Sequence, residues 1–130
     1  MACEMGIMKR DFVPFKNDMF SAVYEAFKRL YPGKSCSCYW DVIEGDDGER
    51  HYGATAFMDD EAVVFVDVGL PVINAVEVFA HELAHVAVGE TEGHGEAWEN
   101  AFEAIHNKYE EVSDEMFPDF IKVNPKDGGE

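Results

Sequence analysis

The feature that most constrains this chain is a segment from Pro71 to Val88 that places two histidines on an otherwise apolar helical pattern. Apolar residues recur in it at three- and four-residue spacing, which is typical of an amphipathic helix with one buried face. Proline at the start fits this prediction, because the first turn of a helix loses no hydrogen bond to it. The fold must therefore cover one side of this helix. The residues expected on that buried side are Val72, Val76, Phe79, Ala80, Leu83 and Ala87.

Two further helices are predicted on either side of this segment. Asn17–Tyr31 has helical apolar spacing, Asn17 or Asp18 as a cap, and Pro32-Gly33 as a stop. After a glycine-rich loop, a third helix is expected from about Gly95 to Val112. Its inward residues are expected to be Trp98, Ala101, Phe102 and Ile105.

Three strands are predicted between the first two helices. Ser37–Glu44 and His51–Met58 are rich in aromatic and β-branched residues, and the turn-forming residues Gly45-Asp46-Asp47-Gly48 separate them. This pattern predicts a β-hairpin. The nearly continuous apolar run Ala62–Val68 predicts a buried strand.

The order helix, three strands, helix, helix predicts an α+β fold with a small three-stranded sheet. With 130 residues, 47% of them hydrophobic, the chain is long enough to bury one core without disulfides. It contains no internal repeat or low-complexity linker, so residues 1–130 are predicted to form a single domain. The tail after about residue 124 is expected to fray.

His81-Glu82-Leu83-Ala84-His85 is a His-Glu-x-x-His motif in the middle of the predicted helix. At 3.6 residues per turn the two histidines lie one above the other on the same helix face, so both imidazoles can bind one Zn²⁺. Glu82 follows the first ligand and is placed to take a proton from water beside the metal. The composition gives about 0.02 chance matches to the motif. The alternative is a surface helix with two histidines one turn apart.

A catalytic zinc usually has three protein ligands, so a third ligand is required. His94 is the favoured candidate, because the glycine-rich loop from Gly89 to Gly93 can bend the chain back over the metal. Trp98, one turn later, can pack the following helix against the first. The alternative is that His94 caps the third helix and that an acidic neighbour binds zinc instead. Those acidic candidates are Glu90, Glu92, Glu96 and Glu99.

The combination of His81-Glu82-x-x-His85 with His94-Gly95-x-x-Trp98 resembles the SprT-like zinc metallopeptidases. The related WLM peptidases carry the same order of motifs: a helix with His-Glu-x-x-His, a loop, and a second motif that begins with histidine. The resemblance covers about Val63 to Phe102. It implies a zincin-like core that holds one Zn²⁺ per chain, with His81, His85 and His94 as ligands. It also implies peptide-bond hydrolysis, with Glu82 as general base. In such folds an edge strand before the metal helix, here Ala62–Val68, receives the substrate as an added strand.

Other polar residues have weaker assignments. An oxyanion donor is expected, and Tyr52, His51, His106 and Tyr109 are the candidates, although nothing in their spacing selects one. Asn74 and Glu77 precede His81 by two turns and one turn, and either can orient a ligand imidazole or be an ordinary polar residue on a solvated helix edge. Cys36 and Cys38 are expected on one side of a strand, as buried small residues.

The net charge of −17 bears on partners. Residues 1–34 carry six basic and four acidic residues, so residues 35–130 hold the whole negative excess. This charge disfavours direct binding of nucleic acid or of an anionic membrane, and it favours a protein or peptide substrate of basic character.

Three cysteines, an N-terminus unlike a signal peptide and the absence of a long apolar run predict a cytoplasmic protein. The alternative function is a zinc-binding regulatory or interaction module without peptidase activity.

Overall fold

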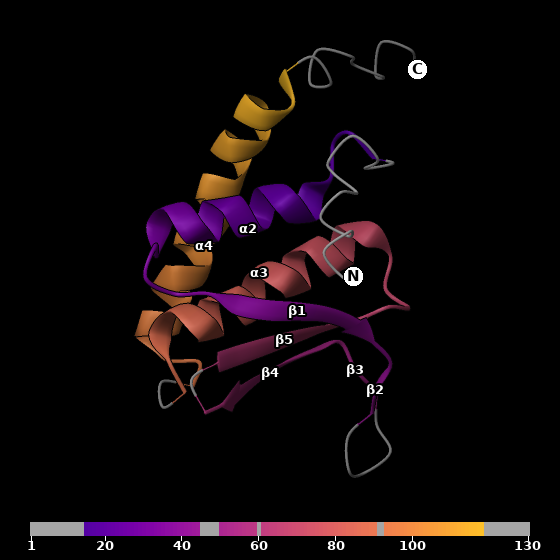
Figure 1. The fold of residues 1–130 in the computed structure, drawn as a ribbon, viewed down its shortest axis with the longest axis vertical. Coiled ribbons are helices and arrows are strands. Elements are labelled where there is room, and N and C mark those ends of the chain that lie inside the picture. Colours follow the sequence, from indigo (N-terminus) through magenta and orange to yellow (C-terminus); the bar gives the residue numbers. More distant parts are fainter. Residues whose placement is uncertain (1–14, 45–49, 60, 91–92, 119–130) are drawn as a thin grey trace, which may run out of the picture.

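The computed structural model describes residues 15–44, 50–59, 61–90 and 93–118. Within these residues the chain has three helices and a small three-stranded mixed sheet, in agreement with the predicted α+β class (Figure 1). The predicted tail after residue 124 lies outside the described residues. The elements are α2 (Met19–Leu30), β1 (Cys36–Asp41), β2 (Ile43–Glu44), β3 (Arg50–His51), β4 (Gly53–Met58), β5 (Glu61–Asp67), α3 (Val72–Val88) and α4 (Glu96–Met116).

The three helices begin and end close to the predicted residues. Asp18 is the N-cap of α2, because its carboxylate accepts a hydrogen bond from the backbone N–H of Phe20 at 3.1 Å. Pro71 precedes α3 and Gly89 ends it, as expected. α4 runs four residues beyond the predicted end at Val112. No helix in the described part of the chain is long and apolar enough to cross a bilayer.

The sheet differs from the predicted hairpin. Its strand order is β1-β5-β4, with β1 parallel and β4 antiparallel to β5. The two segments expected to pair with each other are therefore separated by β5. Only their ends meet, where Ile43 pairs with His51 and Glu44 with Arg50 in a separate two-stranded ladder. The prediction of a full hairpin was wrong because β5 inserts between the two strands and pairs with both.

β5 is the central strand and is largely buried, as predicted, except that it ends at Asp67 and leaves Val68 56% exposed. Its central position contradicts the assignment of Ala62–Val68 as an edge strand. Val64 and Val66 are almost fully buried beneath the helices. The central position pairs both edges of this strand, and the helices cover the face that carries Val64 and Val66. In the described residues, β1 and β4 form the two edges of this sheet.

All three helices lie on one side of the sheet (Figure 1). α3 packs directly on β4 and β5, and α2 and α4 pack on α3 and on each other. α3 therefore has neighbours on two sides, and most of its predicted stripe is buried. Two residues of the stripe differ: Ala87 is only partly buried, and Val72 is 53% exposed because it lies in the first turn, before the helix passes between the sheet and α4. The largest fully buried core side chains include Phe27, Leu83 and Ile105.

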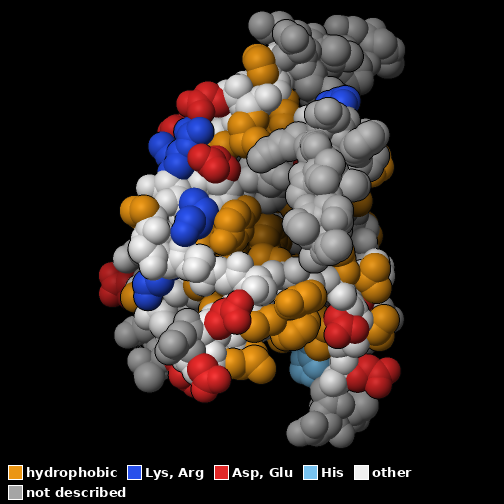
Figure 2. Space-filling model, viewed as in Figure 1, with side chains coloured by type: hydrophobic (Ala, Val, Ile, Leu, Met, Phe, Trp, Pro, Cys, Tyr) orange, Lys and Arg blue, Asp and Glu red, His pale blue; other side chains and the backbone are white. Residues whose placement is uncertain are grey.

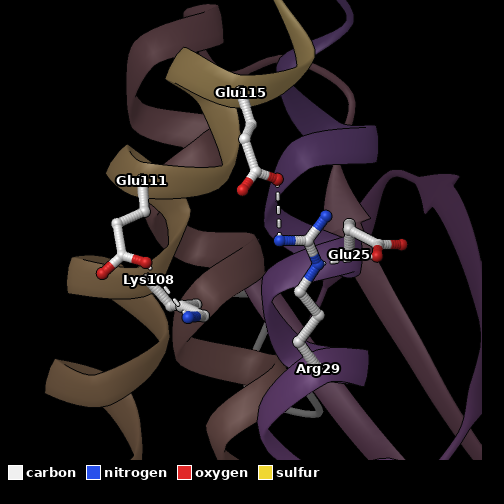
Figure 3. A network of polar contacts seen from close by, with 5 residues as sticks. All are labelled: Glu25, Arg29, Lys108, Glu111 and Glu115. Atoms are coloured by element: carbon white, nitrogen blue, oxygen red, sulfur yellow. Dashed lines mark hydrogen bonds and ion pairs between the residues drawn. The ribbon is translucent and has the colours of Figure 1, made fainter.

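Ion pairs join the helices at the surface (Figure 3). Arg29 on α2 contacts Glu25 one turn earlier and Glu115 on α4, each at 2.9 Å. Lys108 and Glu111 pair within α4 at 3.0 Å. Exposed pairs of this kind contribute about 0–1 kcal/mol each, so the apolar core determines how α2 and α4 pack.

Candidate metal centre

The middle of α3 carries the first two histidines of the candidate metal centre. His81 and His85 are one helical turn apart, and their ring centroids are 5.2 Å apart. Their backbone is held firmly, because Ala80, Leu83 and Ala84 between and beside them are buried against the sheet and the other helices. Both imidazoles are partly exposed on the opposite side of the helix. The same amphipathic pattern that forms the helix therefore also aims the two rings.

The chain reverses direction after α3 and returns His94 to the same place. Gly89 ends the helix with φ 98°, and Gly93 has φ 62°. Both values lie in the left-handed region that glycine enters without steric cost. His94 follows directly, and Gly95 is the N-cap of α4. The reversal expected from the glycine-rich loop is thus present, and it places His94 over the exposed side of α3.

The three imidazoles converge on one point. His94 Nε2 lies 3.0 Å from His85 Nε2 and 3.2 Å from His81 Nε2. Two nitrogens bound at about 2.05 Å to a tetrahedral zinc are about 3.3–3.4 Å apart, so these side chains match the geometry within a few tenths of an ångström. The donor set also fits, since three imidazoles with an open fourth position are a known zinc environment. His81, His85 and His94 can therefore hold one metal ion.

Trp98 supports this cluster from the first turn of α4. Its indole Nε1–H donates a hydrogen bond to the backbone carbonyl of His81 at 3.2 Å. Its ring lies 4.6 Å from the ring of His81 and 4.8 Å from that of His94, and it stacks on Phe102 at 5.3 Å. The expectation that Trp98 packs α4 against α3 is confirmed. This contact fixes the position of His94 relative to the two histidines of α3.

Glu82 points away from solvent, toward the sheet. It is 6% exposed, and its Oε1 accepts a hydrogen bond from the hydroxyl of Thr55 on β4 at 2.6 Å. Burial raises the pKa of this carboxyl, while the Thr55 hydrogen bond and the nearby His94 act in the opposite direction. A buried carboxylate beside a cluster of imidazoles, with a raised pKa, has the properties of a general base.

Burial also shifts the histidines. It lowers the pKa of His81 to about 4, with smaller contributions from His85 and His94. Burial and His94 lower the pKa of His85. Both groups are therefore neutral at pH 7, which is the protonation state that binds a metal.

We expect the metal-free protein to lose stability as the pH falls from 7 to 5.5. Unfolded histidines take up protons near pH 6.5, whereas folded His81 does so only near pH 4, so acid favours the unfolded chain. For one such group the loss is at most about 1.4 kcal/mol, and partial exposure reduces it to about 1 kcal/mol. The raised pKa of Glu82 acts in the opposite direction and reduces this loss. Urea unfolding of chelator-treated protein measures the difference.

The matched variants for this measurement are His81→Gln and His51→Gln. His81→Gln removes the group that resists protonation, so the loss of stability between the two pH values should become smaller. His51 is exposed, and its replacement should leave the loss unchanged. An equal loss in all three proteins would contradict the assignment to His81.

A cavity of about 560 Å³ opens beside His81. Asn74, Glu77 and Tyr52, all singled out in the sequence, line this cavity together with His81. His106 and Tyr109 line a different cavity, against α2, and so lie apart from the cluster. Tyr52, one of the four candidate oxyanion donors, therefore shares a cavity with His81. The cavity is lined by Tyr52, Leu70, Pro71, Asn74, Glu77, Val78, His81 and Phe102.

Two further residues at the site were missed by sequence reasoning. Thr55 binds the carboxylate of Glu82, and Gly53 lets β4 pass close to α3, since a Cβ atom there would lie 2.8 Å from Glu82 Oε2. A glycine inside a strand pattern is itself a signal of close backbone approach, although it does not indicate which element approaches.

Cys36 and Cys38 lie on one side of β1, as expected. The expectation that both are buried was wrong, because Cys38 is exposed at the sheet edge.

Comparison of the chain with protein-family models, with curated proteins and with solved structures finds no match.

Proposed function

We propose that this protein is a zinc-dependent peptidase with a zincin-like core, of the type that the SprT-like resemblance implies. The observation that carries the proposal is the convergence of three imidazole Nε2 atoms beside the buried carboxylate of Glu82. Each role that such a reaction needs from the protein is then filled: three neutral ligands and a base. A binding module has no need of a buried carboxylate in that position.

In this proposal each residue has a definite task. His81, His85 and His94 hold the ion through Nε2. When bound, zinc supplies Lewis-acid chemistry, which polarises a carbonyl group and lowers the pKa of water. Glu82 accepts a proton from the attacking water at a carboxylate oxygen and returns it to the leaving amine. Thr55 holds that carboxylate in place through its hydroxyl. Tyr52 is the favoured donor to the developing oxyanion.

The substrate is proposed to be a protein or peptide, and the cavity beside His81 would receive its side chains. β4 takes the role that the resemblance gave to Ala62–Val68, because β4 is an edge strand and carries Gly53 and Thr55 beside Glu82. Adding an extended segment to an edge strand supplies backbone hydrogen bonds without demanding a sequence. The acidic surface favours basic segments and disfavours nucleic acid, in the cytoplasm where we place the protein.

Zinc content tests the metal centre directly. Purified protein at neutral pH, without chelators, should hold about one zinc per chain by elemental mass spectrometry. His94→Ala should weaken zinc binding at least about tenfold, because an open three-ligand site cannot lose one ligand without a large loss of affinity. His51→Ala is the matched control, since His51 is exposed and outside the cluster.

Two results would contradict parts of this proposal. No tightly held zinc, or unchanged affinity in His94→Ala, would remove the metal centre and the proposed function with it. Zinc bound by all three histidines without cleavage of any protein would favour the regulatory or interaction module instead. The carboxylate variant considered in the Discussion separates these two functions.

A further inference from the structure

Outside the metal centre, two thiols lie in contact on β1. Cys36 and Cys38 project from the same face of the strand, and their Sγ atoms are 3.7 Å apart. β1 is an edge strand on the side of the sheet opposite β4, so the pair is separated from Glu82 and Thr55 by the width of the sheet. The proposed peptidase reaction makes no use of these residues.

The surroundings of the two thiols are unequal. Cys36 is partly buried and packs against the core, whereas Cys38 is exposed. Cys38 also lines a hollow of about 90 Å³ together with Phe20, Trp40 and Phe79. Hydrophobic side chains surround this part of the surface between α2 and β1 in Figure 2. The hollow has room for a molecule of a few heavy atoms, since one water occupies about 30 Å³ in the liquid.

The contact between the thiols has a chemical consequence. A hydrogen bond from the Cys36 thiol lowers the pKa of Cys38, and the same bond, followed by burial, raises the pKa of Cys36. Water solvates a thiolate at the exposed Cys38 better than at Cys36. The exposed sulfur is therefore the nucleophile, and the partly buried one stays protonated beside it.

We propose that Cys36 and Cys38 form a peroxide-reactive dithiol that closes reversibly to a disulfide. The substrate is hydrogen peroxide or another small hydroperoxide. The Cys38 thiolate attacks the terminal peroxide oxygen, the O–O bond breaks, and water or an alcohol leaves with one proton, which forms a sulfenic acid. The Cys36 sulfur then attacks the Cys38 sulfur, the S–O bond breaks, and hydroxide leaves as water with the Cys36 proton. Two thiols are oxidised by two electrons, and one peroxide is reduced.

The strand geometry makes this disulfide labile. At 3.2–3.4 Å per residue, the two Cα atoms of an i, i+2 pair are about 6.4–6.8 Å apart, at the upper end of the range that a disulfide spans. Cys36 is the first residue of β1, so the end of the strand must shift to close the bond. Strained and exposed disulfides have high reduction potentials. Two molecules of glutathione should therefore reopen the bond and form one glutathione disulfide.

Peptide mass spectrometry of the full-length protein tests the proposal. Trypsin cleaves after Lys34 and Arg50, so both cysteines fall on the peptide 35–50, and Cys3 falls on another. After one equivalent of hydrogen peroxide at pH 7, the peptide 35–50 should lose two hydrogens, and excess glutathione should restore them. The fluorescence of Trp40, on the same side of β1, should change in parallel with the mass.

The single variants distinguish attacking from resolving sulfur. Cys36→Ser should accumulate a sulfenic acid at Cys38, trapped by dimedone, because no second thiol resolves it. Cys38→Ser should react with peroxide roughly tenfold more slowly than Cys36→Ser, because its remaining thiol is protonated and partly buried. If the peptide 35–50 keeps both thiols under conditions that oxidise Cys3, or if both variants react at the rate of free glutathione, the proposal is overturned. The zinc content expected for the metal centre is independent of either result.

Discussion

Glu82→Gln should reduce peptide cleavage by about 10²- to 10⁴-fold while zinc binding is retained. Glutamine has the same shape as glutamate and can still accept the hydrogen bond from Thr55, so the side chain should stay between α3 and β4. It cannot take a proton from water at neutral pH. None of the three imidazoles is altered, so the affinity for zinc should change little. Cleavage of a mixed peptide library, followed by mass spectrometry, measures the loss over many peptide sequences at once.

Glu103→Gln is the matched control, because it makes the same chemical change at an exposed position of α4. Glu103 belongs neither to the histidine cluster nor to the lining of the cavity beside His81. Its replacement should leave the rate within a few-fold of wild type. If Glu82→Gln cleaves as well as wild type with zinc bound, the peptidase proposal is wrong, even though the metal centre stands. Wild type that binds zinc but cleaves nothing leads to the same conclusion.

The helices and the cluster of three histidines could be predicted because the signals that specify them are local. Helical spacing, a cap at Asp18 and glycine at the end of α3 lie within a few residues of the structures they determine. His81 and His85 are fixed relative to each other by the helix itself. His94 was predicted over four acidic candidates, because a short glycine-rich loop can return the chain only to a nearby place. The structure brings His94 to the other two histidines.

The sheet could not be predicted in the same way. Turn-forming residues between Ser37–Glu44 and His51–Met58 indicate that the chain reverses there, and it does, at the ladder between β2 and β3. These turn residues do not indicate that β5 lies between β1 and β4. That outcome depends on β5, whose apolar side chains must be covered and whose two edges must both be paired. A parallel pairing between β1 and β5 is a long-range contact, which no local pattern encodes.

Thr55 and Gly53 were missed for a related reason. Their importance comes from the packing of β4 against α3, which brings residue 55 to residue 82 across the sequence. In the sequence, Thr55 is an ordinary β-branched residue in a predicted strand, and nothing near it indicates a partner on another element. The buried carboxylate of Glu82 makes its partner necessary, because a carboxylate removed from water without hydrogen bonds is strongly destabilising. Burial of residue 82 was not predicted, and so neither was the need for Thr55.

Gly53→Ala should destabilise the protein by about 1–3 kcal/mol and also reduce cleavage, although residue 53 bears no functional group. A Cβ atom at this position would lie 2.6 Å from Val78 Cγ1 and 2.8 Å from Glu82 Oε2. Both distances are too short, and valine in a helix has essentially one side-chain rotamer available. Either β4 moves away from α3 or the carboxylate of Glu82 moves from its place beside Thr55. Urea unfolding and library cleavage, measured on the same sample, report the two effects.

Gly33→Ala is the matched control, because a Cβ atom there would meet nothing within 4 Å. Its stability should remain within about 0.5 kcal/mol of wild type. Three-ligand zinc binding should survive in Gly53→Ala under conditions where the protein is folded, since the clash involves Val78 and Glu82 and none of the three imidazoles. A folded Gly53→Ala protein that binds zinc but cleaves poorly would show that the close approach of β4 to α3 positions Glu82. Unchanged stability and cleavage would mean that β4 and α3 are farther apart than this arrangement requires. The proposal that Thr55 holds the carboxylate of Glu82 would then be wrong as well.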